Sequence, residues 1–253
     1  MSPKIVKQAS GLIVSLCVAL LLVLIQSTGP NSGDKVFLDA TPALASQQPP
    51  QLPTLKPHPL PDVLALWEDA ANNGDYFEQV QPLEVGYLVW SKFPVKVFVD
   101  SSEGSQGRWA TAVRLAVQEW AEYLPLEIVG DAEQADITIL RRRPPLRMTA
   151  DGKLDRARSA ETRYEYYTRA SVNSPAVFLH RQKILISPLA EVVVAAAARH
   201  ELGHALGIWG HSPTETDVLY YSQVRNPPSI SARDINTLKR IYQQPTRLGW
   251  PVN

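Results

Sequence analysis

The sequence predicts an α+β domain built on a twisted mixed sheet of about four to five strands. Three observations lead to this prediction: alternating apolar residues over 93–100, a helical stripe over 107–124, and an alanine-rich helix over 192–206 that follows further short strands. Apolar residues at every second position indicate a strand with one buried face, whereas spacings of three and four indicate a helix. The order strand, helix, three strands, helix favours a sheet with one backing helix, and the later helices leave the sheet.

The first strand and the backing helix have the clearest patterns. In the strand over 93–100, valines at positions 95, 97 and 99 alternate with a lysine and a phenylalanine. The helix over 107–124 ends before Pro125, because proline lacks the amide hydrogen that a helix needs. Its buried stripe consists of Trp109, Val113, Ala116, Val117, Trp120 and Leu124.

Further strands are expected over 126–130 and 135–140, and another over 176–180 with 183–187 close behind it. The 141–169 segment is rich in arginine and poor in apolar residues. We therefore expect it to be a solvated, mobile loop, and a substrate-contacting flap is the alternative.

Two helices follow the strands. The helix over 192–206 contains strong helix formers up to Gly203, and Gly207 can end it in the left-handed conformation. In the C-terminal helix, Ser231 is the expected cap and Asp234 completes a capping pair. The buried stripe of that helix is Ile235, Leu238, Ile241 and Tyr242.

The chain is expected to have three parts. Residues 1–29 place two lysines before an apolar run from Gly11 to Ile25, which is the layout of an export signal. Because a membrane span needs roughly 17–25 residues, a cleaved signal peptide and an uncleaved N-terminal membrane anchor both remain open. Residues 30–61 are expected to form a Pro-rich disordered linker in which His58 is solvated, and residues 62–253 form the folded domain.

The charge and the cysteine content restrict the possible functions. The chain has 25 basic and 25 acidic residues, so no general field favours a nucleic acid or an anionic surface as the main partner. The single cysteine, Cys17, lies in the apolar run, so the folded part has neither a disulfide nor a thiolate ligand. The function must therefore be inferred from a local site, and the sequence gives no oligomeric state.

The segment 200–212 reads HELGHALGIWGHS. His200 and His204 stand one helical turn apart on the same side, so both rings can converge on one ion. Glu201 is offset around the helix, where it can accept the proton of a zinc-activated water. Catalytic zinc sites use three protein ligands and leave a fourth position to water. The pattern predicts a Zn²⁺ site that needs a third ligand, and the alternative is a helix with two satisfied surface histidines.

The third ligand decides the class of site. Thermolysin-like enzymes use a glutamate from a later helix, but no glutamate follows Glu215, so that class is disfavoured. Asp217 and Asp234 are carboxylates within reach, yet neither stands in a ligand motif. His211 is the natural choice, because Gly207 allows the helix to stop and the chain to return to the ion.

The HELGHALG run followed by a histidine resembles the metzincins, zinc endopeptidases with the motif HExxHxxGxxH, and more narrowly their matrixin branch. The resemblance covers roughly residues 88–245, and only the histidine segment of it is specific. It implies a metzincin-like fold in which the helix over 192–206 is the zinc-binding active-site helix. The residues that it implies are His200, His204 and His211 as metal ligands, Glu201 as general base and Gly207 as turn glycine.

The chain departs from the family pattern at the third histidine. Three residues separate Gly207 from His211, where the family has two. Gly210 can adopt backbone angles closed to other residues, so we expect a one-residue bulge at Trp209 and Gly210 to absorb the insertion.

A second departure follows His211. Leu219 stands at the methionine-turn position of the family, where an apolar residue of similar size can substitute. Tyr220 and Tyr221 come next. They could reach the metal or the oxyanion, but packing at the base of the specificity pocket is the role expected here.

The expected function is a zinc metalloendopeptidase that hydrolyses peptide bonds of proteins outside the cytoplasm, either secreted, periplasmic or anchored to the membrane. An extended polypeptide substrate would pair with an exposed sheet edge, for which 176–180 or 183–187 is the candidate. The alternative is a catalytically silent, zinc-binding envelope domain that acts as a protein-interaction module. The altered ligand spacing and Leu219 favour this alternative, whereas Glu201 disfavours it, because a structural zinc needs no general base.

Overall fold

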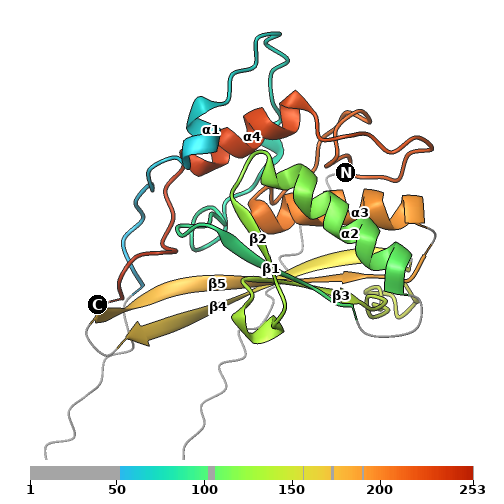
Figure 1. Cartoon of the computed structure of the whole chain (residues 1–253), viewed down its shortest axis with the longest axis horizontal. Coiled ribbons are helices and arrows are strands. Elements are labelled where there is room, and N and C mark those ends of the chain that lie inside the picture. The colour runs from blue at the N-terminus through green and yellow to red at the C-terminus, as the bar shows by residue number, and fades with distance from the viewer. Residues whose placement is uncertain (1–51, 102–105, 156, 172–173, 190, 253) are drawn as a thin grey trace, which may run out of the picture. The chain divides into compact units, whose positions relative to one another are not determined.

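A mixed sheet of five strands underlies the folded domain (Figure 1). The computed structural model describes residues 52–101, 106–155, 157–171, 174–189 and 191–252. The strands are β1 (Val95–Val99), β2 (Leu126–Val129), β3 (Ile137–Arg141), β4 (Ala160–Ser171) and β5 (Ser174–Ile186). The α+β class expected from the sequence is confirmed.

The strand order is β2-β1-β3-β5-β4. β1 pairs in parallel with β2 and β3, β3 pairs in parallel with β5, and β4 is antiparallel to β5. The edges of the sheet are therefore β2 and β4. The expectation that 176–180 or 183–187 offers the exposed edge is wrong. Both segments belong to β5, which pairs with β4 on one side; on its other side residues 182–186 pair with β3, and residues 176–178 bond to the C-terminal segment 249–252.

Strand β4 also corrects the expectation of a mobile loop over 141–169. It pairs with β5 in one long hairpin, so the irregular part of that segment is confined to 142–159. Thr162, Tyr164 and Tyr166 are half-buried, whereas Arg163 between them is exposed. β-branched and aromatic residues at alternate positions are typical of a strand, and the arginines occupy its open face.

Helices α2 (Gln106–Ala121) and α3 (Glu191–Leu206) cover one face of the sheet (Figure 1). The expected apolar stripe of α2 is buried, and Trp120 within it is fully enclosed. Burying a large apolar side chain of this kind contributes about 1.5–3 kcal/mol. The indole of Trp120 also donates a hydrogen bond to the carbonyl of Arg199 at 2.9 Å, which ties α2 to α3.

Helix α4 (Ala232–Tyr242) lies beside the short helix α1 (Asp62–Leu66), on the far side of α3 from the sheet (Figure 1). Lys239 of α4 donates to the carbonyl of Trp67 at 2.7 Å. The expected capping box of Ser231 and Asp234 is confirmed, and so is the buried stripe of α4. The short 3-10 helices η1 (Phe77–Gln79) and η2 (Ala132–Gln134) complete the described elements.

Residues 52–58 contact the C-terminal segment. Lys56 and Thr246 exchange two backbone hydrogen bonds, of 3.1 and 3.0 Å. His58 stacks on Trp250 with ring centroids 4.2 Å apart, and its Nε2 lies 2.8 Å from the carbonyl oxygen of Leu248. The expectation that His58 is solvated is therefore wrong, because these two contacts leave it half-buried.

The predicted export segment, residues 1–29, lies outside the described residues, and so does most of the predicted linker over 30–61. Within the part of the chain that the structure describes, no helix is long and apolar enough to cross a membrane. Export and anchoring therefore stay predictions from the sequence.

Candidate metal centre

Helix α3 places His200 and His204 side by side. Their ring centroids are 4.7 Å apart, and their Nε2 atoms are 3.1 Å apart. The helix continues without a break through both residues, so the four-residue spacing becomes one helical turn. The two rings therefore converge on one point, as the spacing predicts.

Gly207 ends helix α3 directly after this pair. Its φ is +131°, a region that side chains rarely allow. Its amide donates to the carbonyl of His204 at 3.1 Å, and the amide of Ile208 donates to the carbonyl of Gly203 at 3.0 Å. These two bonds form a Schellman motif, which reverses the chain so that the residues after Gly207 return toward α3.

The following turn passes close to the η1 segment. Val80 and Gly210 form an isolated antiparallel bridge, and a Cβ at Gly210 would lie 2.3 Å from the carbonyl oxygen of Gln79. The φ of Gly210 is not positive. The expectation that Gly210 uses unusual backbone angles is therefore wrong: its missing side chain allows two backbones to approach, and the special angles belong to Gly207.

His211 reaches the same place as the two helical histidines. Its ring centroid lies 5.3 Å from that of His200 and 4.9 Å from that of His204. One ring nitrogen from each of the three residues lies within 4.8 Å of the others. His211 is exposed, whereas the other two are half-buried. The extra residue before His211 does not carry its ring away from the pair.

Two backbone carbonyls orient the helical histidines. Nδ1 of His200 lies 2.8 Å from the oxygen of Val218, and Nδ1 of His204 lies 2.7 Å from the oxygen of Ile208. A carbonyl oxygen can only accept, so each Nδ1 donates its proton. In a neutral ring this leaves a lone pair on Nε2. Two lone pairs then face each other at 3.1 Å.

A shared cation relieves this repulsion, whereas protonation at neutral pH does not. Burial, with smaller contributions from neighbouring charges, lowers the pKa of His200 and of His204 to about 4 each, and burial also lowers the pKa of His211. Two nitrogens bound to one tetrahedral zinc at about 2.0–2.1 Å stand roughly 3.3 Å apart. The three imidazoles therefore fit Zn²⁺ with little movement of the two helical rings.

Glu201 is buried against strand β4. It is 8% exposed, and the hydroxyl of Thr162 lies 2.5 Å from its Oε2 and 3.0 Å from its backbone oxygen. Burial raises the pKa of Glu201, although the charge of His200 and the hydrogen bond from Thr162 oppose this. A raised pKa makes the carboxylate a stronger proton acceptor, as a general base requires.

Leu219 packs against helix α3 at Gly203, the residue before His204. It is fully buried, and a Cβ added at Gly203 would lie 2.5 Å from its Cδ2. Tyr220 is half-buried, and its ring centroid lies 4.5 Å from that of Tyr221. The expectation that Tyr221 packs at the base of a pocket is wrong, because this side chain is 67% exposed.

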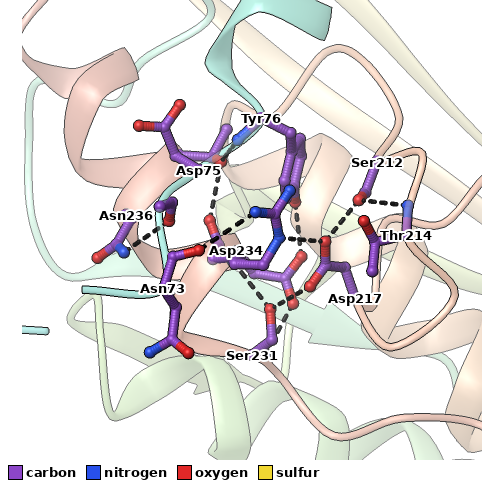
Figure 2. A network of polar contacts seen from close by, with 12 residues as sticks. Asn73, Asp75, Tyr76, Ser212, Thr214, Asp217, Ser231, Asp234 and Asn236 are labelled. Atoms are coloured by element: carbon purple, nitrogen blue, oxygen red, sulfur yellow. Dashed lines mark hydrogen bonds and ion pairs between the residues drawn. The ribbon is translucent and has the colours of Figure 1, made fainter. Parts of the chain in front are cut away.

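The structure adds site residues that the sequence did not indicate. Thr162 lies in the segment that the sequence assigned to a loop. A network of buried polar contacts, which includes Tyr76, Asp217 and Asp234, reaches Ser212, the residue after His211 (Figure 2). The sequence indicated the capping pair of Ser231 and Asp234 and placed Asp217 and Asp234 within reach of the metal, but it gave no sign that this network binds the loop beside the histidines.

Comparison of the chain with models of known protein families finds no match, and comparison with curated proteins finds none either.

Proposed function

We propose that this protein is a zinc metalloendopeptidase of the metzincin, matrixin-like type, with His200, His204 and His211 as the ligands of Zn²⁺. The observation that carries the proposal is that the Nε2 atoms of His200 and His204, each with a free lone pair, lie 3.1 Å apart, with the ring of His211 beside them. Three protein ligands with an open fourth position are typical of catalytic zinc, whereas structural zinc sites are closed. The HExxH sequence on a helix that ends at a glycine supports the family assignment.

Zinc would supply Lewis acidity, which polarises the scissile carbonyl and allows water to lose a proton near pH 7. Glu201 takes up that proton and returns it to the leaving amine. The hydroxyl of Thr162 holds Oε2 of this carboxylate, so we assign the proton transfer to Oε1. Burial of Glu201 raises its pKa, which favours the protonated intermediate state of the shuttle.

The proposed substrate is an extended polypeptide that pairs with β4, the sheet edge that contacts Glu201. Two contacts support this choice: Thr162 of β4 binds Glu201, and Tyr164 of the same strand packs edge-on against Trp209 at 5.0 Å. Pairing through main-chain hydrogen bonds gives affinity with little sequence choice. The balanced charge of the chain gives no support for a nucleic-acid substrate.

The proposed place of action is outside the cytoplasm. The support is the sequence of residues 1–29, in which lysines precede an apolar run. Export followed by cleavage would give a secreted or periplasmic enzyme. Retention of the segment would anchor the enzyme to the membrane.

The test is the substitution Glu201→Gln in the full chain, with zinc content and cleavage of a quenched-peptide library both measured. The amide keeps the size of the side chain but cannot accept the proton. We expect stoichiometric zinc in both proteins and a fall in cleavage rate of at least about 100-fold in the variant.

His211→Ala is the matched variant for the third ligand, and we expect it to bind zinc far more weakly than the wild type. Zinc retained at full affinity in that variant would contradict the ligand assignment. Stoichiometric zinc in the wild type without Glu201-dependent cleavage would instead favour a catalytically silent, zinc-binding envelope domain that acts as a protein-interaction module.

A further inference from the structure

Asp217 is a buried carboxylate next to the candidate metal centre that the proposed reaction does not use. It is 1% exposed, and it accepts hydrogen bonds from Ser212 Oγ, from Ser231 Oγ at 2.8 Å and from Arg233 Nε at 3.0 Å. Figure 2 shows the carboxylate between the two serines. An ionised carboxylate is costly to bury unless donors and an opposite charge surround it, and Asp217 has both.

The donors to Asp217 come from two separate parts of the chain. Ser212 directly follows His211, whereas Ser231 and Arg233 belong to the N-terminal end of α4. Ser212 is further fixed because its amide donates to the carbonyl of Leu219 at 2.8 Å. The carboxylate therefore closes the 211–219 loop on itself and ties it to a helix.

The same end of α4 also holds His200 in place. Asp234 accepts from the amide of Val218 at 3.1 Å, and the carbonyl of Val218 accepts from Nδ1 of His200 at 2.8 Å. The hydroxyl of Tyr76 donates to Asp234 at 2.6 Å. The first turn of α4 thus contacts Val218, whose carbonyl orients His200, and Asp217, which in turn binds the serine beside His211.

We propose that Asp217 is a positioning residue for His211, which holds Ser212 against α4 and so fixes the third imidazole where zinc requires it. The inference rests on the proposed zinc site and deepens it. His200 and His204 are fixed by a helix, but His211 lies exposed on a loop with an additional residue before it. A ligand on such a loop needs outer hydrogen bonds to keep its orientation, and losing these typically lowers metal affinity by about 10–100-fold.

The test measures zinc affinity in the full chain by competition with a chelating dye. Asp217→Asn and Ser212→Ala should each raise the Kd for zinc by about 10–100-fold. Both should also change the visible absorption spectrum of the cobalt-substituted protein, which reports the geometry of the ligands. Ser212→Ala removes only one hydroxyl, so it tests the same link if Asp217→Asn fails to fold.

A double-mutant cycle separates positioning from general stability. If Asp217 acts through His211, then Asp217→Asn should have no further effect on the Kd in a His211→Ala background. Asp136→Asn is the control, because Asp136 accepts from the amide of Lys96 at 2.9 Å, beside β1 and away from the loop. We expect that control to lower the melting temperature without changing the Kd.

Wild-type zinc affinity in both Asp217→Asn and Ser212→Ala would overturn the positioning role and leave the proposed zinc site intact. Equal effects of Asp217→Asn with and without His211 would also overturn it, because the carboxylate would then act on the fold as a whole. A wild-type protein that binds no zinc would contradict the proposed function itself.

Discussion

Gly203 leaves room for Leu219 beneath helix α3, between the turns that carry the two histidines. A Cβ at this position would lie 2.5 Å from Cδ2 of Leu219 and 3.2 Å from Cζ2 of Trp120. Both neighbours are fully buried, so neither can move aside freely. We expect Gly203→Ala to lower the free energy of unfolding by about 1–3 kcal/mol, as measured by urea denaturation of the metal-free protein.

Gly107 of helix α2 provides the matched control. A Cβ at Gly107 would meet nothing within 4 Å. Alanine is the better helix former and Gly107 lies in the first turn of α2, so Gly107→Ala should not lower the free energy of unfolding. If Gly203→Ala were as stable as the wild type or more stable, then Leu219 and Trp120 would leave room for a methyl group at this position.

Single residues of the candidate site differ in how far the sequence could predict them. The spacing of His200 and His204 depends on helix geometry alone, so their convergence follows from the sequence. The contacts of Thr162 and Asp217 depend on how distant segments pack, and the spacing of residues along the chain does not predict such packing. Gly210 shows the same limit, because its importance comes from Gln79, a residue far away in the sequence.

At the scale of elements, the 142–159 loop is fixed to the start of β4 by Glu161. This carboxylate is buried and makes ion pairs with Arg147, with Arg158 at 3.6 Å and with Arg163 at 3.1 Å. Burial raises the pKa of Glu161, but the hydrogen bond from Arg163 and the charges of the three arginines outweigh it and lower the pKa below its ordinary value. The ionised form is therefore the stable one at neutral pH.

We expect Glu161→Gln to release this loop, because the glutamine cannot hold three guanidinium groups. Trypsin cleavage within 142–159, followed by mass spectrometry, should become about tenfold faster. This rate corresponds to a free energy of local opening that is lower by about 1.4 kcal/mol. Glu165→Gln is the control on the same strand. Glu165 pairs with Arg181 at the surface, where an ion pair is worth little. Equal rates of trypsin cleavage in wild type and Glu161→Gln would contradict the role of Glu161 in fixing this loop.

The helices were easier to predict than strand β4, and the reason is physical. Helices α2, α3 and α4 each have a strong sequence signal: an apolar stripe, a run of helix formers or a capping box. Strand β4 is a sheet edge with an exposed face, so more than half of its residues are charged or polar and its composition resembles that of a loop. The alternation of Thr162, Tyr164 and Tyr166 is a weak local strand signal, and the pairing with β5 that fixes the strand is a long-range contact.

At the scale of the whole described domain, three segments distant in sequence hold the fold together at one end of the sheet. Residues 52–58 pair with the segment around Thr246, and the carbonyl of Trp250 accepts from the amide of Phe178 in β5 at 3.0 Å. Proline-rich composition suggested a free linker, yet prolines leave their carbonyls available as acceptors. Arg247, for example, donates to the carbonyl of Pro53.

Acid should destabilise the metal-free protein, and His180 of β5 should contribute strongly to this effect. Its ring is buried in a stack on Trp90, with centroids 4.0 Å apart, and burial lowers its pKa from an ordinary value of 6.5 to about 3. Between these two pH values the imidazole of His180 is therefore protonated in the unfolded chain and neutral in the folded protein. This stabilisation is fully present above pH 6.5 and is lost as the pH falls from 6.5 toward 3, at about 1.4 kcal/mol per pH unit.

The measurement is urea unfolding in the presence of a metal chelator at pH 7, 6 and 5. His180→Phe keeps a ring against Trp90 but removes the titrating group, so its free energy of unfolding should fall less steeply with pH, by about 1.4 kcal/mol per unit. Trp90→Phe is the control, because it disturbs the same stack and keeps the imidazole. It should lower stability at every pH and leave the slope close to that of the wild type.

Identical slopes for wild type and His180→Phe would show that the acid sensitivity arises elsewhere. Because burial also holds His200 and His204 neutral in the folded protein, part of the slope should persist in His180→Phe.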